Sequence, residues 1–88
     1  MWTVKLSRQA ATFLKNLGGK HRMQLEHGLD ELGRDPHTGK ELKGELKGYW
    51  SLRVGVYRII YSIRRHEVVV EVLRIHHRKE VYEKIRRL

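Results

Sequence analysis

The 88-residue chain contains no cysteine and a single proline, and no apolar run in it approaches the roughly 20 residues that a membrane-spanning helix needs. The absence of cysteine excludes disulfides, thiolate zinc sites and cysteine nucleophiles, and it fits a reducing compartment. The first residues also lack the long apolar region of a secretory signal peptide. We therefore expect a cytoplasmic protein with no membrane partner.

Several signatures of enzyme chemistry are missing as well. The sequence has no glycine-rich phosphate loop, no dinucleotide-binding fingerprint and no close acidic pair of the glycosidase type. Four histidines are scattered along the chain without the spacing of metal ligands, namely His21, His27, His37 and His66. We therefore expect neither a bound metal nor another cofactor.

Positive charge is the main feature of the composition. Lys and Arg number 19 against 10 Asp and Glu, which gives a net charge of +9 with the histidines neutral. In a small domain this excess is the electrostatic footprint of a protein that binds nucleic acid, or of one shielded by an acidic partner protein. Counterion release from a nucleic acid rewards such a charge density. A merely soluble cationic surface is the alternative.

The hydrophobic pattern of the first half predicts a strand followed by two helices. Apolar and polar residues alternate over residues 2–6, and Ser7 is placed to cap the helix that follows. Apolar residues then recur at helical spacing on both sides of the glycine pair at 18–19, with the second helix over about residues 20–32. We expect an antiparallel helical hairpin, in which Gly28 weakens the second helix or lets the paired helix approach closely.

The second half of the chain predicts an antiparallel meander. A break around Pro36 is followed by a lysine-bearing turn that Leu42 and Leu46 should order. We expect a short turn at residues 64–66, and the valine run at 68–70 predicts a last strand that is central or covered on both faces. Period-two alternation places the three strands at about residues 49–54, 56–64 and 67–76.

Apolar residues spaced by four and three predict a short helix over residues 79–88. The chain is long enough for one hydrophobic core and contains no linker that would separate a second domain. We therefore expect a single α+β domain over residues 1–88, with the order strand, helical hairpin, three-stranded antiparallel meander and short C-terminal helix.

The strand pattern places positive charge on one face of the expected sheet. Ser51 and Arg53 alternate with apolar residues in one strand, and Arg58 lies just across the turn in the next. A guanidinium keeps its charge in proteins, so these arginines are suited to clamp a phosphate rather than to act as bases. Salt-bridged surface arginines are the alternative interpretation.

A second cationic cluster, residues 74–79, lies where the last strand ends and the chain turns toward the expected final helix. It contains His76 and His77 among arginines and lysine, and a neutral imidazole beside arginines can act as a general base or acid. Ordinary solvated histidines are the alternative. Tyr82 follows the cluster and is placed to stack on an unpaired base of single-stranded RNA.

Three segments of the chain together carry a family resemblance. They are residues 42–44 (Leu-Lys-Gly), 50–61 (Trp-x-Leu-Arg-x-Gly-x-Tyr-Arg-x-x-Tyr) and 77–82 (His-Arg-Lys-Glu-Val-Tyr). With the order of the expected elements, they resemble the RelE/ParE superfamily of toxins from type II toxin–antitoxin systems, over nearly the whole chain. That superfamily contains both ribosome-dependent mRNA endonucleases and gyrase poisons, so the resemblance is less specific for activity.

The endonuclease branch implies a metal-independent mRNA interferase that cleaves in the ribosomal A site, through attack of the RNA's own 2′-hydroxyl. On this resemblance, Arg58 stabilises the scissile phosphate, Arg78 helps the leaving 5′-oxygen to depart, and Tyr82 stacks on a substrate base. Arg53 matches a further basic position of the central strand.

The chain departs from the best-known bacterial members at two positions. Those members carry a pair of lysines where this chain has Tyr49 and Ser51, and one of the lysines is a candidate base. Without a base, cleavage should be slower by about 10²–10⁴. We assign Ser51 to substrate binding. The base would come from Lys43 or Lys47 of the preceding turn, or from His76 or His77. We also assign Lys43 and Lys47 to substrate binding.

The resemblance also implies partners. A cognate acidic antitoxin, similar to RelB, should fold over the toxin and silence it. The free toxin should be a monomer that acts on mRNA in the ribosome. Two alternatives stay open, a ParE-like DNA gyrase inhibitor and a catalytically weak family member that binds RNA. The combination of Arg58, Arg78 and Tyr82 favours the endonuclease.

Overall fold

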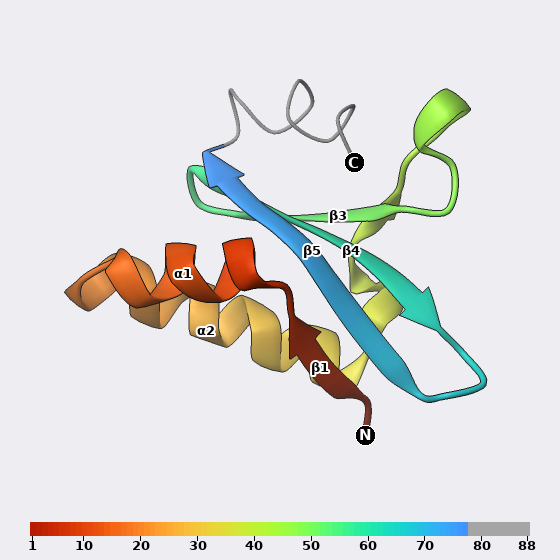
Figure 1. Ribbon diagram of the computed structural model, residues 1–88, viewed down its shortest axis with the longest axis horizontal. Coiled ribbons are helices and arrows are strands. Elements are labelled where there is room, and N and C mark those ends of the chain that lie inside the picture. The colour runs from red at the N-terminus through yellow and green to blue at the C-terminus, as the bar shows by residue number, and fades with distance from the viewer. Residues whose placement is uncertain (78–88) are drawn as a thin grey trace.

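The computed structural model describes residues 1–77, which form a five-stranded sheet with two α-helices on one of its faces (Figure 1). The expected α+β class is therefore confirmed. The short helix expected over residues 79–88 lies outside the described residues. With η for a 3₁₀ helix, the elements are β1 (Thr3–Leu6), α1 (Arg8–Asn16), α2 (Gly19–Arg34), η1 (Pro36–Thr38), β2 (Lys40–Glu41), η2 (Gly44–Leu46), β3 (Trp50–Val54), β4 (Tyr57–Arg64) and β5 (Val69–His77).

The strands lie in the order β1-β5-β4-β3-β2. β3, β4 and β5 form the expected antiparallel meander, β1 joins β5 in parallel, and β2 pairs with β3 at the opposite edge. The sequence pattern contains no signal for β2, because two residues are too few to show alternation. β5 lies between β1 and β4, which confirms the internal position predicted from its valine run.

The helical hairpin begins as predicted but packs differently at its glycine. The Ser7 hydroxyl accepts a hydrogen bond from the N–H of Ala10 at 3.1 Å and so caps α1. A Cβ at Gly28 would lie 2.7 Å from Cγ2 of Val54 in β3. The missing side chain therefore lets α2 approach the sheet and not the paired helix, which corrects the expectation. Within residues 1–77, neither helix has the length and apolar character needed to cross a membrane.

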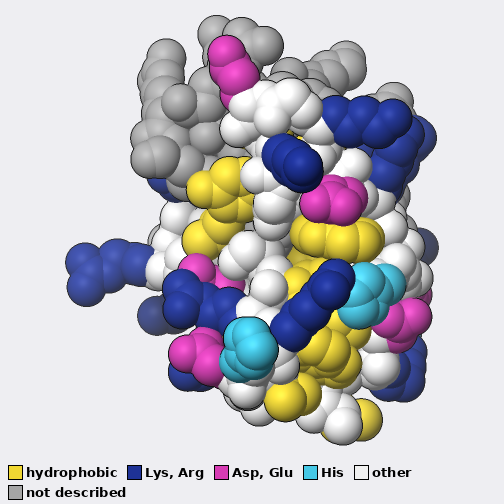
Figure 2. Space-filling view, turned by 90° about the vertical axis from the view of Figure 1, so that its right-hand side faces the viewer, with side chains coloured by type: hydrophobic (Ala, Val, Ile, Leu, Met, Phe, Trp, Pro, Cys, Tyr) yellow, Lys and Arg dark blue, Asp and Glu magenta, His cyan; other side chains and the backbone are white. Residues whose placement is uncertain are grey.

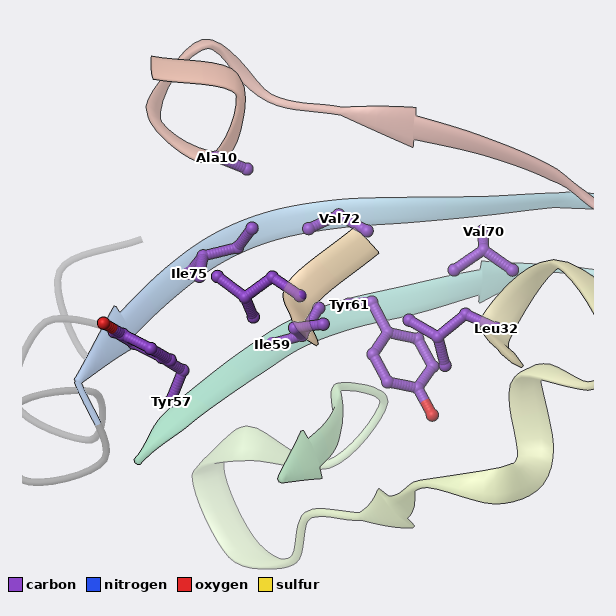
Figure 3. Packing of buried hydrophobic residues seen from close by; sticks show 9 residues of the cluster. Ala10, Leu32, Tyr57, Ile59, Tyr61, Val70, Val72 and Ile75 are labelled. Carbon is purple, nitrogen blue, oxygen red and sulfur yellow. The ribbon is translucent and has the colours of Figure 1, made fainter. Parts of the chain in front are cut away.

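The hydrophobic core lies between the helical hairpin and the sheet (Figure 3). The hydroxyl of the fully buried Tyr61 donates a hydrogen bond to the carbonyl of Pro36 at 2.6 Å. Burial raises the pKa of Tyr61 to about 12, so the hydroxyl remains protonated and links β4 to the segment after α2. The buried residues of this core are Ala10, Leu25, Leu32, Tyr57, Ile59, Tyr61, Val70, Val72 and Ile75.

The turn between β4 and β5 is longer than the sequence predicts. β4 ends at Arg64 and β5 begins at Val69, so residues 65–68 form the turn in place of the expected residues 64–66. The backbone N–H of Val68 donates to the carbonyl of Arg65 at 3.3 Å. Val68 has a φ of 56°, a left-handed conformation that β-branched residues rarely adopt. Closure of the turn thus overrides the strand preference of the first valine in the run.

β5 contains a bulge at Leu73. Ile60 of β4 is paired with Arg74, whereas the next residue, Tyr61, is paired with Val72, so Leu73 has no partner across the ladder. A bulge inserts one extra residue into one strand and thereby changes which face the following side chains point to. The alternation along β5 is therefore reversed after Leu73.

Candidate functional site

The sheet face opposite the helices, called the open face from here on, carries two arginines and a histidine side by side. Arg53 of β3 is paired with Arg58 of β4, and Arg58 is paired with His76 of β5. Residues directly opposite each other in antiparallel strands point to the same face of a sheet. Three neighbouring strands therefore place these side chains next to one another, in what we call the cationic row. Arg53 and Arg58 share a face, as their alternation predicts.

Ser51 orients Arg58 within the cationic row. Nη1 of Arg58 donates a hydrogen bond to the hydroxyl of Ser51 at 3.4 Å, and Ser51 is only 5% exposed. Arg53, by contrast, is exposed to solvent. The row thus combines one guanidinium that is held on the sheet with one that extends into solvent. Both keep their positive charge, so they can bind an anion but cannot accept a proton.

The bulge of β5 brings Arg74 and His76 to the open face. Val72 points into the core before the bulge, and Ile75 points into the core after it. Without the extra residue, strict alternation would send positions 74 and 76 into the core with Val72. Sequence reasoning places Arg74 in the second cationic cluster without giving it a role. The signal that identifies it is the break in alternation between Val72 and Ile75.

A hydrophobic cap covers part of the open face beside the cationic row. Ile60 points to this face and is nevertheless fully buried, because Leu42, Leu46 and Tyr49 pack against it. These three residues come from the segment between β2 and β3, so the ordering role expected for the two leucines is confirmed. Figure 1 shows that this segment lies on the side of the sheet away from α1 and α2.

Lys43 and Lys47 lie on the capping segment rather than in the cationic row. Both side chains are exposed. With Glu41, Leu42 and Gly44 they line a small hollow of ≈ 210 Å³. The structure therefore places the two lysines above the sheet, at the margin of the open face.

The two neighbouring histidines of β5 lie on opposite faces. His77 is paired with Tyr57, which belongs to the core, so His77 points to the helical side of the sheet. Its ring lies 6.2 Å from the ring of Tyr57, and the Tyr57 hydroxyl lies 3.3 Å from Nδ1 of His21. The structure therefore pairs His76 with Arg58, with the His76 ring buried and 6.2 Å from the ring of Phe13 in α1, but does not bring His77 to Arg58. The remaining predicted site residues, Arg78 and Tyr82, lie outside the described residues.

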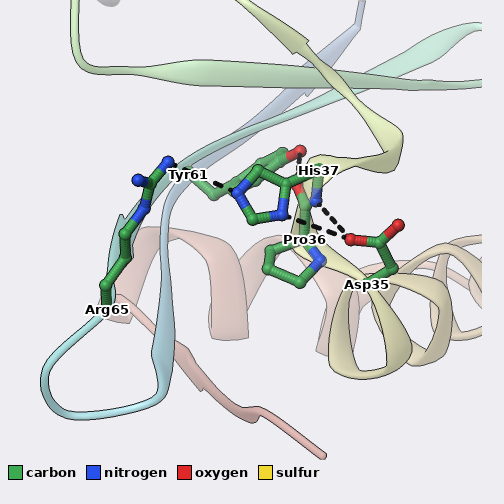
Figure 4. A network of polar contacts seen from close by, with 5 residues as sticks. All are labelled: Asp35, Pro36, His37, Tyr61 and Arg65. Carbon is green, nitrogen blue, oxygen red and sulfur yellow. Dashed lines mark hydrogen bonds and ion pairs between the residues drawn. The ribbon is translucent and has the colours of Figure 1, made fainter.

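A polar cluster that sequence reasoning misses lies near the far end of β4 (Figure 4). The backbone N–H of His37 donates to a carboxylate oxygen of Asp35 at 3.0 Å, and the ring Nδ1 lies 3.3 Å from the same oxygen. The other ring nitrogen lies 3.4 Å from Nη2 of Arg65. His37 and Arg65 are 28 residues apart in the sequence, so no local motif reveals that they lie together with Asp35.

The side of the molecule that carries the β4–β5 turn has a mixed surface (Figure 2). Hydrophobic side chains form a band there, and basic, acidic and histidine side chains lie around it. Within residues 1–77, no group of three His, Cys, Asp or Glu side chains could hold a metal ion. The arrangement most suited to bind a polyanion is therefore the open face, where the cationic row contains no acidic residue.

Comparisons with known proteins agree on one kind of relative. A family model described as ParE toxin of type II toxin–antitoxin system, parDE, matches residues 4–82. Toxin RelG of Mycobacterium tuberculosis is 38% identical over 61 residues, which cover 68% of this chain and 70% of that protein.

Two solved structures resemble the fold closely. The toxin–antitoxin complex RelBE2 of M. tuberculosis contains a chain that is 32% identical, with a TM-score of 0.78 over 86% of this chain and 96% of that one. The isolated RelE toxin of E. coli is 24% identical, with a TM-score of 0.76 over 99% of this chain and 97% of that one, and it supports the fold alone.

Proposed function

Because the chain belongs to the RelE/ParE superfamily of toxins from type II toxin–antitoxin systems, we propose that it is a ribosome-dependent mRNA endonuclease of the RelE type. The observation that supports this function most directly is the cationic row of Arg53, Arg58 and His76. Arg53 and Arg58 are like charges directly opposite each other, which destabilises a sheet, and an RNA phosphate bound between these two guanidinium groups would offset the repulsion.

In the proposed reaction, the 2′-hydroxyl of the mRNA attacks the adjacent phosphorus atom in the ribosomal A site. A general base takes the proton of that hydroxyl, the bond from phosphorus to the 5′-oxygen breaks, and the departing oxygen takes up a proton. The products are a 2′,3′-cyclic phosphate and a 5′-hydroxyl. Negative charge grows on the phosphate oxygens in the transition state, where Arg53 and Arg58 would stabilise it.

We assign the general base to His76. Its position opposite Arg58 supports this role, because both side chains would contact the same phosphodiester. Imidazole is the side chain best suited to proton transfer near neutral pH. Lys43 and Lys47, at the margin of the open face, are assigned to contacts with the RNA backbone. The family resemblance alone supports the roles of Arg78 at the leaving oxygen and of Tyr82 in base stacking.

A cognate antitoxin is the second expected partner. RelBE2 of M. tuberculosis was solved as a toxin–antitoxin complex. With a net charge of +9, this chain is suited to an acidic, RelB-like antitoxin that covers the cationic surface and prevents access to the ribosome. The free toxin would be a cytoplasmic monomer that acts on mRNA in translating ribosomes.

A DNA gyrase inhibitor is the alternative function. It is favoured by the description of the matching family model as a ParE toxin. Such a protein would use the same fold to bind gyrase and would not cleave RNA. The absence of lysine at positions 49 and 51 also keeps a catalytically weak RNA-binding member as a third candidate.

Cell-free translation followed by primer extension tests the proposed function. The wild-type protein should produce cuts at fixed positions within codons, and Arg58→Ala should slow the cutting by about 10²–10³. The matched control is Arg64→Ala, since Arg64 is an arginine of the same strand that is paired with Glu71 at 3.2 Å. This control should cut like the wild type.

The outcome of two parallel assays separates the candidates. Inhibition of gyrase supercoiling without RNA cuts would establish the ParE-like function and exclude the endonuclease. Ribosome binding with neither effect would identify the RNA-binding member. For Arg78, substitution should lower the cleavage rate far more than the affinity for ribosomes, and equal losses would reduce it to a docking residue.

A further inference from the structure

We propose that Arg74 forms a second phosphate subsite on the open face and binds the phosphate adjacent to the scissile one in single-stranded RNA. This role rests on the proposed binding of RNA at the cationic row, and it adds a residue that the family resemblance does not supply. Four observations on Arg74 support it, which concern its position, its buried nitrogen, its hydrophobic neighbours and the hydrogen bonds that fix its backbone.

The first observation is the position of Arg74 relative to Arg58. Arg74 is paired with Ile60, which lies two residues beyond Arg58 on β4, so Arg74 and Arg58 are diagonal neighbours on one face. Diagonal neighbours in an antiparallel sheet are about 7–8 Å apart. This separation is similar to that of successive phosphates along a single strand. One RNA strand can therefore place a phosphate at each arginine.

The second observation is an unsatisfied donor. The Nε atom of Arg74 is buried and has no hydrogen-bond partner within the part of the chain that the structure describes. A buried N–H of a charged group costs free energy when it lacks an acceptor. A phosphate oxygen is a suitable acceptor, because a guanidinium can bind a phosphate through two parallel N–H groups. Bound RNA would thus satisfy a donor that the described protein residues leave unused.

The third observation is the hydrophobic cap next to Arg74. Ile60 lies between Arg74 and Ser51 in the sheet, and Leu42, Leu46 and Tyr49 cover it. The cap blocks a direct path for a polyanion from Arg74 across the sheet toward β2. An RNA strand that leaves the cationic row would therefore follow β5 from His76 to Arg74. The subsite at Arg74 therefore sets the direction in which the RNA runs across the open face.

The fourth observation is the rigid backbone on both sides of Arg74. The carbonyl of Leu73 accepts a hydrogen bond from the Ser7 hydroxyl at 2.7 Å. The backbone N–H and C=O of Ile75 are both bonded to the side chain of Gln9, at 3.0 and 2.9 Å. A binding residue is most effective when the supporting structure fixes its position before the ligand arrives.

The test measures the affinity of labelled toxin for ribosomes programmed with an mRNA that carries 2′-O-methyl groups and cannot be cleaved. A neutral methylphosphonate replaces the phosphate on one side of the scissile position, and then on the other side. For wild-type protein, one of the two replacements should weaken binding about 10-fold. Arg74→Gln should bind the 2′-O-methyl mRNA that lacks a methylphosphonate about 10-fold more weakly than the wild type does. Its affinity should fall no further when the methylphosphonate that weakens wild-type binding is introduced.

Two variants serve as controls. Arg64→Gln removes the same charge from the open face, at an arginine that forms an ion pair with Glu71. This variant should bind like the wild type. Arg74→Lys keeps the charge and should restore part of the sensitivity to the methylphosphonate. Circular dichroism confirms that each variant is folded.

The outcomes distinguish this inference from the proposed endonuclease function. If Arg74→Gln binds as tightly as Arg64→Gln, or is weakened as much as the wild type by the replacement to which the wild type is sensitive, the subsite is wrong. If the subsite is found but wild-type protein makes no cuts during translation, the endonuclease function is wrong and the subsite stands. The same RNAs are also titrated without ribosomes, so that a failure of ribosome binding leaves the subsite measurable. The subsite is also wrong if neither methylphosphonate changes the affinity of the wild type or of any variant, with ribosomes and without them.

Discussion

Gln9 of α1 binds both backbone polar groups of Ile75 in β5. Its side-chain amide donates to the Ile75 carbonyl at 2.9 Å, and its side-chain oxygen accepts from the Ile75 N–H at 3.0 Å. The register of β1 against β5 extends only to Val72, so Gln9 takes the place of a neighbouring strand beyond that point. Together with the bond from Ser7 to the Leu73 carbonyl, it fixes the segment that follows the bulge.

Replacing Gln9 with leucine should therefore destabilise the protein through two lost hydrogen bonds. The N–H and C=O of Ile75 would lose their partners, which costs about 1–3 kcal/mol in the free energy of unfolding. Urea denaturation followed by circular dichroism measures this value. Gln24→Leu, at an exposed glutamine of α2, is the matched control and should change it by less than about 0.5 kcal/mol. Equal stability of the two variants would show that the Gln9 contacts contribute nothing.

The opposite orientation of His76 and His77 leads to a prediction on pH dependence. If His76 is the general base, the cleavage rate of the wild type should fall as the pH drops through the range in which imidazole is protonated. His76→Gln should remove this limb of the pH–rate profile and slow cleavage by about 10²–10⁴.

His77→Gln is the matched control for His76→Gln, because it makes the same substitution one residue away on the helical side of the sheet. This variant should keep the acidic limb of the profile. Loss of the limb in His77→Gln, or its survival in His76→Gln, would contradict the assignment of the base.

Local patterns predict most of the fold because short-range signals determine it. The cap at Ser7, the helical hairpin and the alternation on either side of Arg53 and Arg58 all depend on residues close in sequence. The shared face of the two arginines follows from that alternation. The α+β class and the order of the main elements can therefore be predicted from the residues alone.

Long-range contacts determine what the sequence pattern cannot predict. The bulge at Leu73 depends on Ser7 and Gln9, which lie 66 residues away in sequence from the groups that they bind. This bulge determines that His76 lies on the open face and His77 on the helical side, and it makes Arg74 a candidate site residue. Likewise, the role of Gly28 depends on Val54 of the sheet, which no helical pattern contains.

Two glycines of α2 should respond to alanine in opposite directions. At Gly28 the new Cβ would lie 2.7 Å from Val54 Cγ2, whereas at Gly33 its nearest neighbours, in Trp2 and Val4, would be 3.6 Å away, an ordinary contact. Overpacking costs about 1–3 kcal/mol, and the gain in helix propensity is about 1 kcal/mol. Gly28→Ala should therefore lower the midpoint of thermal unfolding, and Gly33→Ala should raise it.

A second substitution tests the cause of the Gly28 effect. Adding Val54→Ala to Gly28→Ala removes the methyl group that the new Cβ would meet. The double variant should be more stable than the sum of the two single effects allows, by about 0.5–3 kcal/mol. Strict additivity would show that the close approach of α2 to β3 does not limit the side chain at this position.

The buried hydroxyl of Tyr61 should make stability depend on alkaline pH. Burial raises the pKa of Tyr61 from 10.0 to about 12, so the folded chain keeps a proton that the unfolded chain has lost. This contribution is complete below pH 10 and disappears as the pH rises through 12. Tyr61→Phe also loses the hydrogen bond to Pro36, at a cost of about 1 kcal/mol. In urea denaturation, the stability difference from wild type should narrow above pH 10, and a constant difference would contradict the effect.

The pairing of Arg53 with Arg58 predicts a conflict between stability and function. Two like charges directly opposite each other cost about 0.2–1 kcal/mol in a sheet, so Arg53→Gln should raise the free energy of unfolding of the free toxin by up to that amount. The gain should shrink in high salt, because Arg53 is exposed and its charge is screened. The same variant should bind programmed ribosomes more weakly, since it removes a phosphate contact. A variant that lost both stability and binding would instead indicate that Arg53 has a structural role, and the anion site would then depend on Arg58.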